Sequence, residues 1–134
     1  MATKKEQEQQ ERAEAIMQLR KLLRPGSLVY TVLCSCSASD MTRRINLYTV
    51  YKGRMAFLTG YAAKALGYRH DYKRGGLVVG GCGMDMGWHT VYCLSHTLFP
   101  KGFIPAKAGK RGRNGIPDTD QDTDGGYALD QMWL

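Results

Sequence analysis

LVVGGCGMDMGWHTVYCLSHTLF, residues Leu77–Phe99, decides the fold that the sequence predicts. Residues Leu77–Val79 are β-formers between two glycine pairs, which is typical of a short buried strand. The glycines that follow permit a sharp bend, and Asp85 is a typical N-cap for a helix that begins near Met86. Pro100 ends this helix, because proline has no N–H group to donate.

The helix expected over residues 86–98 has two unlike faces. The face with small and apolar side chains is expected to pack on the core, and it carries Gly87, Trp88, Val91, Leu94, Ser95 and Leu98. The opposite face carries His89, Cys93 and His96, which are ordinary surface residues unless they act as ligands or catalysts.

Two chemical interpretations of this segment remain open. The side chains that suit zinc are Cys82, His89, Cys93 and His96. However, His89 and His96 lie roughly 10 Å apart along the helix axis, which is long for one tetrahedral ion. In the other interpretation Cys82 is a nucleophile, because a helix N-terminus lowers the pKa of a nearby thiol. Cys82, Asp85 and His89 are therefore the catalytic candidates if the protein is an enzyme.

The chain has 134 residues and a net charge of +7, with 19 Lys and Arg against 12 Asp and Glu. This length suits one domain, and no apolar run approaches the about 20 residues that a membrane helix needs. The charged N-terminus lacks the apolar segment of a secretory signal, and the four cysteines do not form the pattern of a secreted disulfide framework. We therefore expect a cytoplasmic protein with no membrane partner and an affinity for acidic macromolecules.

Hydrophobic periodicity predicts a single α+β domain over residues 1–100. The expected order is an N-terminal helix, a three-stranded antiparallel meander, a short helix, a fourth strand and a C-terminal amphipathic helix. The helices are expected at 4–23, 60–67 and 86–98, and the strands at 28–37, 42–51, 55–59 and 77–79. Residues 101–134 are rich in glycine, proline and charge, and we expect an irregular tail whose last residues dock on the domain.

Basic and aromatic residues gather in the expected loops and turns. The residues predicted to contact a nucleic acid or another acidic partner are Arg43, Arg44, Arg69, Tyr72, Lys73, Arg74, Lys110, Arg111 and Arg113. Tyr68 and Tyr72 are expected to add stacking on unpaired bases. The alternative is a cationic surface without a specific partner.

A run of alternating aspartates near the C-terminus resembles a calcium loop. Asp120, Asp122 and Asp124 precede Gly125, and Gln131 stands where such loops carry a bidentate glutamate. A solvated acidic run explains the same residues. The sequence therefore predicts no cofactor and favours no metal, with calcium and zinc kept as alternatives.

The chain resembles a family of small bacteriophage and prophage proteins that has no established activity. The resembling segments are LRKLLRPG (19–26), Ser37-x-Ser39-x-Met41-Thr42-Arg43, AKALG (63–67), VGGCGMDMGWH (79–89) and the terminal DGGYAL…WL. Together with the charge, this resemblance implies an accessory protein that binds a host nucleic acid or nucleoprotein in the host cytoplasm. Inhibition of a host defence complex such as a CRISPR effector fits that role. A small enzyme centred on Cys82, Asp85 and His89, and a virion structural or assembly component, are the alternatives, and the oligomeric state stays open.

Overall fold

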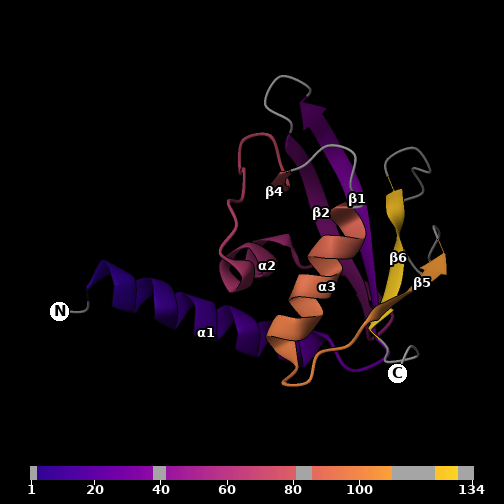
Figure 1. Cartoon of the computed structure of the whole chain (residues 1–134), viewed down its shortest axis with the longest axis horizontal. Helices are drawn as coiled ribbons and strands as arrows, with labels where there is room; N and C mark the ends of the chain where they lie inside the picture. Colours follow the sequence, from indigo (N-terminus) through magenta and orange to yellow (C-terminus); the bar gives the residue numbers. More distant parts are fainter. Residues whose placement is uncertain (1–2, 38–41, 81–85, 110–122, 130–134) are drawn as a thin grey trace.

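The computed structural model describes residues 3–37, 42–80, 86–109 and 123–129. It is an α+β structure in which α2 (Thr59–Leu66) and α3 (Met86–Leu98) lie against an antiparallel sheet (Figure 1). The long helix α1 (Lys4–Leu22) crosses beside them and contacts both (Figure 1). The predicted fold class is therefore confirmed.

Helix α1 starts with a capping box. The Glu6 amide donates to the Thr3 hydroxyl at 3.1 Å, and the Thr3 amide donates back to the Glu6 carboxylate at 3.4 Å. Only the second half of the helix reaches the core, through Ala15 and Leu19, and Leu23 follows them inward. The C-terminal half of α1 thus docks on the domain, and its polar first half is exposed.

The sheet has six strands in the described part of the chain, in the order β3-β2-β1-β6-β5, with β4 also paired to β2. The expected meander is present as β1 (Leu28–Ser37), β2 (Thr42–Tyr51) and β3 (Arg54–Phe57), and the fourth strand as β4 (Leu77–Gly80). All pairings are antiparallel.

The prediction of an irregular tail over residues 101–134 is wrong for two segments. Residues Pro105–Gly109 form β5 and residues Thr123–Leu129 form β6, and β6 pairs with β1 on one side and β5 on the other. Tyr127 and Leu129 point into the core, which confirms that this part docks on the domain. Glycine and charge dominate the composition of the tail, so the short alternation of Tyr127 and Leu129 was not recognised as a strand.

The outer edge of β2 is divided between two strands. Strand β4 pairs with Thr42–Ile45 and β3 with Tyr48–Tyr51, so neither strand reaches the backbone between them. The start of α2 fills this gap, because the Thr59 hydroxyl accepts the Leu47 amide at 2.8 Å and the Leu58 amide donates to the Leu47 carbonyl at 2.8 Å. The backbone of the divided edge is thus hydrogen-bonded without a continuous neighbour strand.

Helix α3 packs on the core with the predicted face. Gly87, Val91, Leu94, Ser95 and Leu98 are buried, whereas the predicted core residue Trp88 is only half-buried and donates its indole N–H to the Pro105 carbonyl at 3.2 Å. The Arg20 guanidinium donates to the Leu98 carbonyl at 2.6 Å, which satisfies a free carbonyl at the end of α3. Among the described residues, no helix combines the length and the apolar character that crossing a lipid bilayer demands.

Candidate aromatic and basic binding surface

The residues proposed for catalysis are only partly placed. Cys82 and Asp85 lie outside the described residues, whereas His89 lies half-buried on α3. The His89 Nδ1 atom is 3.9 Å from Cys93 Sγ, one helical turn away. Burial and the neighbouring Cys93 thiol raise the pKa of Tyr68, in that order of importance. The contacts of His89 and Tyr68 thus converge on Cys93, which the catalytic hypothesis did not include.

The structure also bears on the two metal interpretations. His96 is exposed, and its ring contacts the Tyr92 ring with centroids 4.4 Å apart. Within residues 3–37, 42–80, 86–109 and 123–129, no three or more His, Cys, Asp or Glu side chains group in a way that suits a metal ion. For calcium, Asp120 and Asp122 lie outside the described residues and Asp124 belongs to β6. The calcium-loop interpretation therefore stays a prediction.

The loop between α2 and β4, residues 67–76, is organised by Asp71. One Asp71 carboxylate oxygen accepts the backbone amides of Lys73 at 3.1 Å and Arg74 at 3.0 Å, and the other accepts the Arg44 guanidinium at 2.9 Å. These hydrogen bonds, first that from the Arg74 backbone and then that from Arg44, lower the pKa of Asp71 to about 2. The carboxylate therefore stays ionised and holds the turn that follows it.

The backbone of the same loop is fixed from both ends. The Asp71 amide donates to the Gly76 carbonyl at 3.0 Å, and the Gly75 amide donates to the Asp71 carbonyl at 2.7 Å. Gly76 has a φ of +94°, and a Cβ there would lie 3.0 Å from the backbone of Arg44. Only glycine suits this combination of positive φ and close approach.

Four predicted contact residues are turned outward by this loop. Arg69, Lys73 and Arg74 are exposed, and Tyr72 is the most exposed large apolar side chain among the described residues, at 80 %. Because Asp71 and the backbone make the hydrogen bonds that shape the turn, these side chains are left to face solvent. This part of the predicted surface is therefore accessible to a partner.

Other predicted contact residues are placed differently. Arg44 is 3 % exposed and is held by Asp71, so its prediction as a surface contact is wrong. The Arg44 charge is paired with the Asp71 carboxylate, which lies 27 residues later in the chain. Arg43 is half-buried, and its Nε atom is buried without a partner among the described residues. Lys110, Arg111 and Arg113 lie outside the described residues, and Tyr68, expected to stack on bases, is half-buried beside Cys93.

An aromatic hollow adjoins the basic loop. Four large apolar side chains are exposed in the described part of the chain, and three of them, Phe57, Tyr61 and Tyr72, line one hollow of about 270 Å³. Gly60, Lys64 and His70 complete its lining. We name the hollow and the exposed cations Arg69, Lys73 and Arg74 together the aromatic-basic surface.

Two of the aromatic side chains of the hollow contact other rings. The His70 ring contacts the Tyr72 ring with centroids 4.1 Å apart, and the Tyr48 ring meets Phe57 edge-on at 5.0 Å. Sequence reasoning missed Phe57 and Tyr61. Phe57 ends the edge strand β3, and Tyr61 is exposed on α2 among buried alanines, so neither position carries a local signal that marks it as part of a site.

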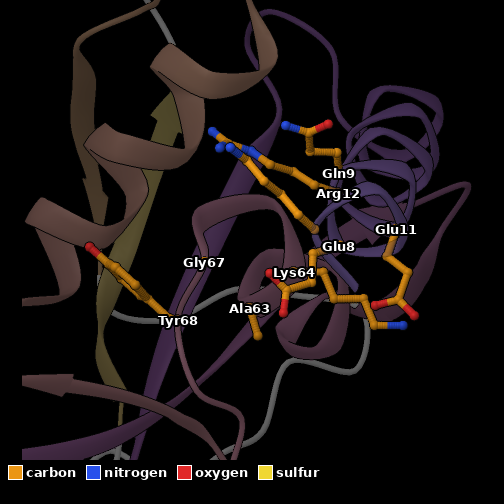
Figure 2. Close-up of a pocket in the computed structure, with 9 residues that line it drawn as sticks. Glu8, Gln9, Glu11, Arg12, Ala63, Lys64, Gly67 and Tyr68 are labelled. Carbon is orange, nitrogen blue, oxygen red and sulfur yellow. The ribbon is translucent and has the colours of Figure 1, made fainter. Parts of the chain in front are cut away.

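A larger hollow of about 520 Å³ lies between α1 and α2. Figure 2 shows Gln9 and Arg12 of α1 on one side of this hollow and Tyr68 on the other. Its charged lining mixes both signs, with Lys5, Arg12 and Lys64 beside Glu8 and Glu11. The carboxylates oppose an anionic ligand, so we favour the smaller aromatic hollow as the site despite the difference in volume.

Comparison with protein-family models, with curated proteins and with solved structures found no match for this chain.

Proposed function

We propose that the protein binds nucleic acid through the aromatic-basic surface. The observation that carries the proposal is the coincidence of three exposed aromatic side chains with three exposed cations around one hydrogen-bonded loop. Cations contact phosphates, and aromatic rings stack on bases, so both parts of a nucleotide have a counterpart on this surface. The net charge of +7 adds attraction at longer range.

The resemblance to phage and prophage proteins supplies the biological setting of this proposal. The target would be a host nucleic acid or a nucleoprotein, and the outcome would be interference with a host complex such as a CRISPR effector. Affinity capture from infected cells, with and without nuclease treatment, tests this setting. Loss of all captured partners after nuclease treatment would support nucleic acid as the direct target.

The proposed binding predicts a defined dependence on salt. Fluorescence anisotropy with a labelled oligonucleotide across a salt series should show affinity falling as salt rises. The double variant Lys73→Ala/Arg74→Ala should make the negative slope of log affinity against log salt shallower by about 2, because each phosphate contact contributes about 1 to its magnitude.

The control removes the same charge elsewhere. Lys4→Ala/Lys5→Ala lies at the exposed start of α1 and should leave the slope near that of the wild type. A slope of zero for the wild type, or equal effects of the two double variants, would contradict phosphate contacts at this loop.

A further inference from the structure

We infer that the aromatic hollow holds one unpaired base of a single-stranded nucleic acid, stacked on Tyr72 and bordered by Phe57 and Tyr61. This inference rests on the proposed function and specifies its ligand. Inside a duplex the bases are stacked on one another, so an aromatic ring of the protein reaches a base only when the strand is single or the base is displaced.

The size of the hollow suits one base. Its volume of about 270 Å³ lies just below the range of about 300–1,000 Å³ for pockets that enclose drug-sized ligands. One base therefore fits between the aromatic side chains while its sugar and phosphate stay outside. Lys73 and Arg74 adjoin Tyr72 along the chain and are exposed, so they are the cations that we assign to that phosphate.

Tyr72 is held in place before any ligand arrives. The loop around it is fixed by the hydrogen bonds of Asp71, and its ring contacts the His70 ring with centroids 4.1 Å apart. A rigid aromatic surface loses little conformational entropy on binding, which favours affinity. An exposed Tyr72 that was free to move would lose this advantage.

His70 supports Tyr72 by packing and not by a polar contact with the ligand. Its Nδ1 atom is buried without a hydrogen-bond partner among the described residues, and a Cβ on Gly60 would lie 3.9 Å from it. A buried nitrogen without a partner disfavours folding. We therefore attribute the support to the contact of the His70 ring with Tyr72, and an aromatic ring without nitrogen should serve equally well.

The test compares three oligonucleotides of equal length by fluorescence anisotropy: a thymidine single strand, its duplex with oligoadenosine, and an abasic strand with the same phosphates. The wild type should bind the thymidine strand more tightly than the other two. Tyr72→Ala and Tyr61→Ala should each weaken that binding by about 10- to 100-fold and leave the salt slope unchanged, because stacking involves no counterion release.

Two further variants separate stacking from general loss of exposed surface. Met17→Ala removes the fourth exposed large apolar side chain, which lies on α1 outside the lining of the aromatic hollow but borders a neighbouring hollow with Tyr61, and it should change binding less than twofold. His70→Phe should bind like the wild type, whereas His70→Ala should bind more weakly. Circular dichroism should show all of these variants folded, because the substituted side chains are exposed or border the hollow.

The outcomes distinguish this inference from the proposed function. Equal affinity for the three oligonucleotides, with no effect of Tyr72→Ala but a normal salt slope, would overturn the base site and leave phosphate binding intact. Absence of binding to any oligonucleotide at low salt would overturn both. Polyglutamate of the same charge that binds as tightly as the thymidine strand would also overturn the base site.

Discussion

Helix α3 and the loop 67–76 both carry residues of the kinds that bind or catalyse, yet the structure uses them differently. On α3, most side chains pack: Val91, Leu94 and Leu98 are fully buried, and His89 is half-buried beside Cys93. In the loop, one carboxylate and the backbone make the shaping contacts, so the remaining side chains stay exposed. The comparison teaches that histidine and cysteine in a motif indicate a binding surface only where their side chains reach solvent.

The largest effect should come from breaking the packing of α3. Leu94→Ala removes a fully buried side chain and should lower the free energy of unfolding by about 2–5 kcal/mol, measured by urea denaturation. Oligonucleotide affinity per folded molecule should stay unchanged. Tyr72→Ala should show the reverse pattern, with weak binding and unchanged stability, and two variants that both lose stability and binding would remove the distinction between the regions.

A smaller effect should come from the divided edge of β2. Thr59→Val keeps the shape of the side chain but leaves the buried Leu47 amide without an acceptor, so it should lower the free energy of unfolding by about 1–3 kcal/mol. Thr59→Ser keeps the hydroxyl and should retain most of the stability. Equal stability of the Val variant and the wild type in urea denaturation would show that this hydrogen bond is dispensable.

The smallest effect on stability at neutral pH should come from Asp71. The contribution of its carboxylate to the stability of the fold changes only at acidic pH. The hydrogen bonds from Arg74 and Arg44 lower the pKa of Asp71 from 3.8 to about 2, so the ionised carboxylate stabilises the folded protein above the ordinary value. That stability should be lost as the pH falls from about 4 towards 2.

NMR measures this titration directly. The amide shifts of Lys73 and Arg74, which donate to Asp71, should change with a midpoint near pH 2, whereas those of α3 should not follow them. Asp71→Asn is the control and should lack this midpoint. A midpoint near 4 in the wild type would mean that Asp71 does not organise the loop.

Local sequence signals predicted the helices and the first four strands well. Periodicity gave the buried face of α3, and the meander followed from three β-forming runs separated by turns. Strands β5 and β6 were missed because their stability comes from pairing with each other and with β1, and not from the composition of residues 101–134.

The candidate site was predicted only where its residues are neighbours in sequence. Arg69, Tyr72, Lys73 and Arg74 were named correctly as exposed, because a loop rich in charge faces solvent. Arg44 was misplaced, since its partner Asp71 is distant in the chain and becomes adjacent only through the pairing of β2 with β4. The hollow itself joins β3, α2 and the loop, so no local pattern could reveal it.

The position of β6 between β1 and β5 has a consequence for synthesis of the protein. Strand β1 can pair with β2 once both have been synthesised, but its other edge must wait for β6, because Leu28 pairs with Ala128. Until then the nascent sheet presents open backbone groups to any neighbouring polypeptide. Long-range pairing of this kind slows folding, so we expect the growing chain to be most prone to aggregation while β1 lacks β6.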